Sequence, residues 1–175
     1  MSLTVLLGGA RAGKSALALE LARDQGAPVV YVATAEAGDE EMASRIEQHR
    51  TERPEAWRTI EEPVALRSAL ASVEPDACVV VDCLTLWVAN LLARGDDVLA
   101  EAEAVAELAA ARPGPTIVVS NEVGLGIVPA SLVAREYRDL LGAVNAAFVR
   151  SAKDAAFVVS GRAIPLQPGW WRPSA

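Results

Sequence analysis

The chain has 175 residues, 52% of them hydrophobic, and carries a formal net charge of −7. This length and composition exclude a disordered chain and fit one domain with a buried core, which we expect to span residues 1–175. The acidic balance excludes a broad basic face for nucleic acid, since Lys14 and Lys153 are the only lysines.

Short β-branched runs alternate with helical segments along the chain. In order, we expect a strand at 3–8, a helix at 14–23, a strand at 29–34, a helix from 39 to about 52, a short extended segment at 57–62, a helix at 65–73, a strand at 78–83, helices at 85–93 and 98–111, a strand at 116–120, a helix from 132 to about 151 and a last strand at 155–160. Continuous apolar strands separated by helices indicate a mainly parallel sheet covered on both faces. The expected fold is therefore α/β with three layers.

The segment GGARAGKS directly follows the first expected strand and leads into the first expected helix. It matches the pattern G-x-x-x-x-G-K-[ST], in which backbone N–H groups wrap phosphates, the lysine reaches the outer phosphates and the hydroxyl binds Mg²⁺. The other interpretation is a glycine-rich turn with a chance lysine, but the strand before it and the helix after it favour an anion site. The segment predicts a P-loop NTPase domain whose phosphate-binding residues are Gly8, Gly9, Ala10, Arg11, Ala12, Gly13, Lys14 and Ser15.

An acidic residue at the end of another strand normally completes a P-loop site by holding Mg²⁺. The run VVVDC places Asp82 at such a strand end, so Ser15 and Asp82 are the predicted metal-site residues. The alternative is that Asp82 caps the helix that follows it.

Several classes of P-loop protein lack support in the sequence. A regulatory GTPase needs an N-K-x-D and a D-x-x-G motif, and the nearest stretches are NEVG at 121–124 and DCLT at 82–85. The net charge disfavours a nucleic-acid translocase. A small-molecule kinase fits the size of the chain, and a binding or switch protein is the alternative from a different class.

His49 is the only histidine of the chain. Helical spacing places it on one stripe with Met42 and Ile46, which by itself favours a structural role. The neighbouring arginines, Arg45, Arg50 and Arg53, favour the opposite interpretation. Arginines disfavour a protonated imidazole and offer bidentate sites for phosphate oxygens, so a neutral His49 among them suits attack on phosphorus.

Five stretches together resemble a known family: GGARAGKS, YVATA, DEEMASRIEQHRTERPEAWRTIEEP, VVVDCLTLWVANLL and SNEVGLGIVPASLVAREYRDLLGAVN. The family is that of the bifunctional adenosylcobinamide kinase/adenosylcobinamide-phosphate guanylyltransferases of cobalamin biosynthesis, and the likeness runs in order from about Leu3 to about Gly161. Ala12 stands where the family commonly has serine, and the tail with Trp170 and Trp171 departs from the family pattern. Packing of this tail onto its own domain is the simpler expectation for the two tryptophans.

The resemblance implies two reactions. A nucleoside triphosphate, ATP or GTP, phosphorylates adenosylcobinamide with the help of Lys14. His49 then attacks the α-phosphate of GTP, and the bound GMP passes to adenosylcobinamide phosphate, giving adenosylcobinamide-GDP. The resemblance also implies Mg²⁺, a homo-oligomer with three subunits, and nucleotide contacts that extend the P-loop with Thr34, Ala35, Glu36, Arg50, Thr51, Glu52, Arg53, Glu61 and Asp82.

For several further residues the sequence allows either a role in the site or a structural role. Asn121 and Glu122 follow a strand end, where α/β sheets hold functional groups, and Glu122 is a candidate site residue together with Arg45. Glu61 and Glu62 precede Pro63, and one of them is a candidate to contact the guanine or ribose or to act as a base; helix capping or solvent exposure is the alternative for Glu62. On the last long helix, Arg135, Arg138 and Asp139 suit either surface ion pairs or a subunit contact.

The sequence also predicts the cellular compartment of the protein. The N-terminal stretch lacks a basic n-region and a cleavage site, and the apolar run at 79–93 is broken by Asp82 and Asn90, so neither a signal peptide nor a membrane span is expected. Cys78 and Cys83 form no disulfide framework, which makes the reducing cytoplasm the default expectation.

Overall fold

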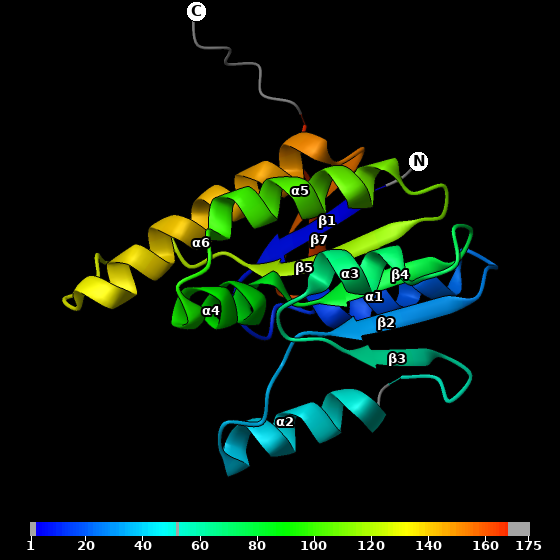
Figure 1. Ribbon diagram of the computed structural model, residues 1–175, viewed down its shortest axis with the longest axis horizontal. Helices are drawn as coiled ribbons and strands as arrows, with labels where there is room; N and C mark the ends of the chain where they lie inside the picture. The colour runs from blue at the N-terminus through cyan, green and yellow to red at the C-terminus, as the bar shows by residue number, and fades with distance from the viewer. Residues whose placement is uncertain (1–2, 52, 168–175) are drawn as a thin grey trace, which may run out of the picture.

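The computed structural model of the chain describes residues 3–51 and 53–167, apart from the side chains of Glu41 and Arg45 (Figure 1). The strands are β1 (Leu3–Gly8), β2 (Val29–Ala33), β3 (Arg58–Glu61), β4 (Cys78–Asp82), β5 (Thr116–Asn121), β6 (Asp154–Val159) and β7 (Arg162–Pro165). The helices are α1 (Lys14–Arg23), α2 (Glu40–Thr51), α3 (Leu66–Ala71), α4 (Leu84–Arg94), α5 (Val98–Ala111) and α6 (Leu132–Ser151). Glu52, Trp170 and Trp171 lie outside the described residues.

One sheet joins the strands in the order β3-β2-β4-β5-β1-β6-β7. Six strands are parallel, and β7 pairs antiparallel with β6 at the edge. The central strands read as unbroken apolar runs because both of their faces are buried; every residue of β2 is buried, for example. The mainly parallel sheet expected from the sequence is confirmed.

Helices cover both faces of the sheet. On one face, α3, α4, α5 and α6 pack onto the strands around the fully buried Trp87, Leu141 and Phe148. On the other face, α1 contributes Ala18, Leu19 and Ala22 to a second core. Figure 1 shows α2 apart from both layers, beyond the β3 edge of the sheet.

Predicted and observed boundaries agree within two residues, but the last predicted strand needs a correction. It ends at Val159, because Ser160 and Gly161 take φ values of 50° and 73° and form the two-residue turn that leads into β7. Strand β7 is not among the strands expected from the sequence. All four residues of β7 are exposed, so the sequence of this strand lacks the alternation of apolar and polar residues that would predict a strand.

The topology brings the carboxyl ends of four parallel strands to one edge of the sheet. Gly8 at the end of β1 lies opposite Asn121 at the end of β5, and Ala33 at the end of β2 lies opposite Asp82 at the end of β4. Ligands of open α/β sheets bind at this edge. Among the described helices, none is long and apolar enough to cross a membrane.

Candidate functional site

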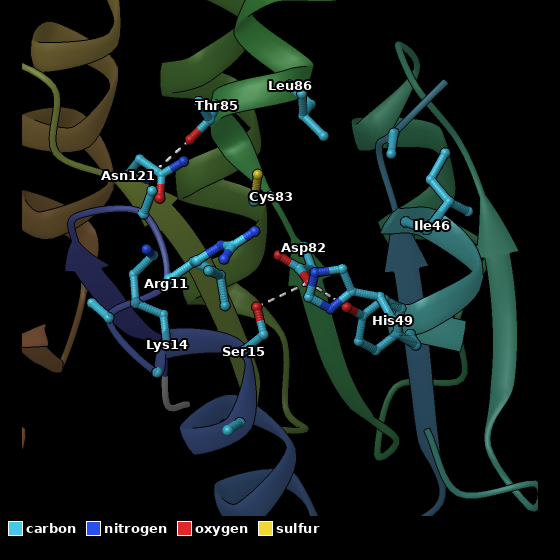
Figure 2. A pocket seen from close by; sticks show the side chains of 18 of the residues that line it. Arg11, Lys14, Ser15, Ile46, His49, Asp82, Cys83, Thr85, Leu86 and Asn121 are labelled. Atoms are coloured by element: carbon cyan, nitrogen blue, oxygen red, sulfur yellow. Dashed lines mark hydrogen bonds between the residues drawn. The ribbon is translucent and has the colours of Figure 1, made fainter. Parts of the chain in front are cut away.

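A cleft of about 550 Å³ lies at the carboxyl ends of the parallel strands (Figure 2). Three parts of the chain form its walls: the P-loop with the start of α1, the ends of β2, β4 and β5, and one face of α2. The lining residues are 10–16, Tyr31, Ala33, Ala35, Met42, Ile46, His49, Arg53, Asp82, Cys83, Thr85, Leu86, Val119 and Asn121.

Two glycines shape the P-loop. Gly8 has a φ of 153°, and a Cβ built there would lie 2.1 Å from the carbonyl oxygen of Val158 on the neighbouring strand. Gly13 has a φ of 101° and occupies the N-cap of α1. A side chain is thus excluded by sterics at Gly8 and disfavoured by conformation at Gly13. The loop therefore turns tightly and directs the N-terminus of α1 at the cleft, as anion binding requires.

Lys14 is the first residue of α1 and lies inside the loop. Its side chain is buried, with 6% relative exposure, and its Nζ donates to the carbonyl oxygen of Gly9 at 2.7 Å. Burial lowers the pKa of Lys14, while Cys83 and Asp82 act in the opposite direction. The cleft thus holds a cation close to the backbone N–H groups of the loop.

Asp82 is hydrogen-bonded to two hydroxyl groups from different elements. Ser15 Oγ donates to Asp82 Oδ2 at 3.3 Å, and the hydroxyl of Tyr31 donates to the same oxygen. Burial raises the pKa of Tyr31, and the Asp82 carboxylate raises it further, so the phenol keeps its proton and remains a donor. The N-cap of α4 is Cys83, and the carboxylate of Asp82 points to Ser15 and Tyr31 rather than to that helix.

The oxygen pair of Ser15 and Asp82 fits a magnesium ion. Hydroxyl and carboxylate oxygens are hard ligands, and Mg²⁺ usually takes one or two protein ligands and completes its shell with water and substrate phosphates. The described residues contain no cluster of three or more histidine, cysteine, aspartate or glutamate side chains that would hold a metal on its own. A metal at this place would therefore depend on a bound nucleotide.

His49 lies in the last turn of α2 and faces the cleft. Met42 and Ile46 line the same wall, so the stripe that helical spacing predicts is the face that α2 turns toward the P-loop. Figure 2 shows the imidazole of His49 reaching from α2 toward Ser15 and Asp82. The stripe is therefore a wall of the cleft and not part of either apolar core.

The arginines that are close to His49 in sequence occupy different positions in the structure. Arg53 lines the cleft, with its Cζ 3.8 Å from the centre of the Tyr31 ring and its Nη1 3.5 Å from Thr59 Oγ1. Arg50 is exposed and is not among the lining residues. The side chain of Arg45 is outside the described part of the chain. Of the two arginine side chains that are described, only Arg53 lines the cleft together with His49.

The other predicted contact residues divide into two groups. The lining includes 10–15, Ala35, His49, Arg53 and Asp82 but not Gly8, Gly9, Thr34, Glu36, Arg50, Thr51, Glu61 or Glu122. Thr34 instead joins two strand ends, because its Oγ1 donates to the Cys83 carbonyl at 2.7 Å and accepts from the Cys83 N–H at 2.8 Å.

The acidic candidates have local roles. Glu62 Oε1 accepts from the N–H groups of Val64 and Ala65 at 3.0 and 2.8 Å, so it holds the turn that leads into α3. The N-cap of α3 is Ala65, without a side-chain cap, so the helix capping considered for Glu62 is not observed. Glu122 Oε1 accepts from the N–H of Gly124 at 2.6 Å within its own loop. Arg138 and Asp139 form an ion pair with an N–O distance of 2.8 Å on the surface of α6.

Tyr31 and Thr85 line the cleft without having been predicted from the sequence, whereas Asn121 belongs to the strand end that the sequence predicts to hold functional groups. Tyr31 was visible as a phenol inside an apolar strand, where its hydroxyl needs a partner. Of the two polar residues at the end of β5, Asn121 lines the cleft and Glu122 does not.

The chain matches the model of a family described as cobinamide kinase / cobinamide phosphate guanyltransferase over residues 4–166. It is 47% identical to the bifunctional adenosylcobalamin biosynthesis protein CobP of Pseudomonas aeruginosa, with 93% of this chain and 96% of that protein covered. It is 37% identical to the bifunctional adenosylcobalamin biosynthesis protein CobU of Escherichia coli K12, with 93% of this chain and 98% of that protein covered.

Solved structures resemble the chain in fold alone. The RadB recombinase superposes with a TM-score of 0.51 at 20% identity, covering 89% of this chain and 73% of that one. An ATPase of a type III secretion system superposes with a TM-score of 0.55 at 13% identity, and the chain spans 51% of its length. The predicted α/β P-loop fold is thereby confirmed.

Proposed function

This chain belongs to the cobinamide kinase / cobinamide phosphate guanyltransferase family, and we propose that its one cleft at the P-loop serves both reactions. The protein is a bifunctional enzyme of adenosylcobalamin biosynthesis. The observation that carries the proposal is that Lys14 and His49 line the same cleft, from opposite walls.

The nucleotide lies with its outer phosphates in the P-loop. Residues 10–15 surround them with backbone N–H groups, and Lys14 neutralises part of their charge. Ser15 and Asp82 would hold Mg²⁺, which neutralises phosphate charge when it is bound. ATP and GTP share the triphosphate that this part of the cleft recognises.

In the kinase step, the terminal phosphoryl group passes to the hydroxyl of adenosylcobinamide. The bond between that phosphorus and the bridging oxygen breaks and releases the nucleoside diphosphate, a bond to the substrate oxygen forms, and the hydroxyl proton passes to solvent. The P-loop and Lys14 supply positioning and charge stabilisation, which account for most of the catalysis in phosphoryl transfer.

In the guanylyl transfer step, His49 attacks the α-phosphate of GTP. A P–N bond forms to the imidazole, the P–O bond to pyrophosphate breaks, and GMP stays on the protein. A phosphate oxygen of adenosylcobinamide phosphate then displaces the imidazole, which gives adenosylcobinamide-GDP. Arg53 lines the same cleft, which supports a role in stabilising the transferred phosphate.

The test is to incubate the protein with Mg²⁺ and GTP labelled at the α-phosphate. We expect a GMP adduct on His49 that is lost in mild acid and kept in alkali, because protonation turns imidazole into a good leaving group. His49→Ala abolishes the adduct and leaves phosphorylation of adenosylcobinamide detectable. Gln48→Ala, an exposed neighbour on α2, is the matched control and keeps both activities. Acid-stable label, or label that persists in His49→Ala, contradicts the assignment.

We also propose that the chain acts as a single domain in a homo-oligomer, with the trimer that the family resemblance implies. Apolar side chains gather in the segment from the end of β5 to the start of α6, which projects beyond the sheet (Figure 1). Relative exposure is 80% at Leu125, 97% at Ile127, 75% at Leu132 and 66% at Val133. Such a patch supports a subunit contact.

Sedimentation of the wild type and of Ile127→Asp tests the oligomer: we expect a single oligomer for the former and a shift to monomer for the latter. A monomeric wild type contradicts the proposal.

The free thiols of Cys78 and Cys83 support placement of the protein in the reducing cytoplasm.

A further inference from the structure

Asn121 has a particular place in the sheet. Strand β5 lies between β1, which leads into the P-loop, and β4, which ends at Asp82. The carboxyl end of β5 therefore lies between the phosphate loop and the acidic residue of the cleft. Asn121 ends this strand, opposite Gly8 in the pairing with β1.

Hydrogen bonds fix the main chain of Asn121 on both sides. Its N–H donates to Thr85 Oγ1 at 2.9 Å, and its carbonyl accepts from Asn145 Nδ2 at 3.0 Å. Asn145 in turn accepts from Ser120 Oγ at 2.6 Å.

This network is uncharged and buried, with 3% relative exposure at Asn145 and 0% at Ser120. Buried polar groups destabilise a fold unless they are hydrogen-bonded, and here they bond to one another and to the backbone of Asn121. The strand end is therefore held rigidly.

The side-chain amide of Asn121 is available to bind a ligand in the cleft. It is one of the lining residues, and within residues 3–51 and 53–167 no protein group hydrogen-bonds its amide. In Figure 2 it lies near Thr85, on the side of the P-loop that carries Arg11 and Lys14 and across the cleft from His49.

The chemistry of an amide suits this place. Its NH₂ group donates hydrogen bonds to phosphate oxygens and adds no negative charge beside a triphosphate. The next residue, Glu122, carries such a charge, but its carboxylate is bound to the N–H of Gly124 and does not line the cleft.

We propose that the side-chain amide of Asn121 donates a hydrogen bond to the terminal phosphate of the bound nucleoside triphosphate. This rests on the proposed function: if His49 attacks the α-phosphate from the α2 wall, the terminal phosphate lies toward Lys14 and Asn121. Asn121 then distinguishes a triphosphate from a diphosphate, and it assists transfer of the terminal phosphoryl group more than attack at the α-phosphate.

The test compares the binding of two probes in the presence of Mg²⁺ by calorimetry: GDP, and a GTP analogue with an imido bridge between the outer phosphates. Asn121→Ala is expected to weaken binding of the analogue about tenfold and to leave GDP binding within about twofold, as for loss of one hydrogen bond to a charged group. Asn121→Asp is expected to weaken the analogue further, because it places a carboxylate beside the phosphate.

Gln25→Ala removes a surface amide at the end of α1 and serves as the control that changes neither affinity. Unchanged GDP binding also shows that the Asn121 variants are folded. Equal weakening of both probes by Asn121→Ala, or weakening of neither, overturns the inference while the proposed cleft stands. Failure of the wild type to bind either probe overturns the proposed cleft, and this inference with it.

Activity supplies a second readout. At saturating nucleotide, kcat for phosphorylation is expected to fall about 100-fold in Asn121→Ala, the size of effect known for loss of one transition-state donor. The rate of GMP adduct formation on His49 is expected to stay within about threefold, because His49 attacks at the other end of the triphosphate. Equal losses in both rates overturn the assignment to the terminal phosphate.

Discussion

Lys14 and Lys153 provide a natural comparison, because the chain has no other lysine. Lys14 is buried in the P-loop, whereas Lys153 is exposed immediately before β6. Lys14→Ala is expected to lower both phosphorylation and GMP adduct formation by about 100-fold or more, because one phosphate cradle serves both. Lys153→Ala leaves both rates unchanged. The measurement is the rate of each step at saturating GTP, and a normal adduct rate in Lys14→Ala would place the guanylyl site elsewhere.

The sequence predicts the residues of this cleft unevenly. The P-loop is local, so its pattern names residues 8–15 directly, and residues 10–15 line the cleft. Helical spacing also identifies the stripe of Met42, Ile46 and His49, but it cannot say whether that stripe faces a core or a ligand. The contact of Tyr31 with Asp82 joins residues from two strands and depends on the order of the sheet, which no local pattern contains.

Helix α2 carries His49, and the segment that follows it is attached to the sheet through Arg53. The guanidinium lies 3.8 Å from the centre of the Tyr31 ring, a planar stacking that lysine cannot reproduce. Arg53→Lys is expected to lower the rate of GMP adduct formation about tenfold, since misplacement of a reacting group costs this much or more. Phosphorylation is expected to change less than about threefold.

Arg50→Lys is the matched control for that prediction, because Arg50 is exposed and does not line the cleft. Single-turnover labelling with α-labelled GTP measures the effect. If Arg53→Lys and Arg50→Lys behave alike, the stacking on Tyr31 has no part in placing His49.

Prediction from the sequence succeeds for the strands whose residues are buried on both faces of the sheet. Strands β2, β4 and β5 lie in the centre of the sheet, and their apolar runs are visible in the sequence because both faces are covered. Strand β7 is an exposed edge strand, held by pairing with β6 and by its turn, so its sequence carries no periodicity. Edge strands of this kind depend on neighbours that only the folded chain provides.

The stability of the whole molecule is expected to fall in alkaline solution. Burial raises the pKa of the Cys78 thiol from its ordinary value of 9.0 to about 11, against an opposing effect of Arg112. Between pH 9 and 11 the unfolded chain loses this proton and the folded chain keeps it, so the free energy of unfolding decreases as pH rises. Cys83, whose pKa burial also raises to about 11, acts in the same direction.

Urea denaturation at pH 8 and pH 10 measures this effect. The wild type is expected to lose about 1 kcal/mol more between the two pH values than Cys78→Ala does, because the variant lacks the titrating thiol. Any cost of the smaller side chain is the same at both pH values and cancels. Parallel loss of stability in the two proteins would contradict a raised pKa at Cys78.

The placement of Lys14 and His49 on opposite walls of one cleft also imposes an order in time. A cleft of about 550 Å³ lies within the size range of sites for one small ligand. If His49 carries GMP in this cleft, as proposed, a second nucleotide would compete with that GMP for the same space, and each molecule would alternate between its two activities. Free cobinamide would have to wait for a molecule whose histidine is vacant. The relative supply of the free corrinoid and its phosphate would then decide which reaction a given molecule performs next.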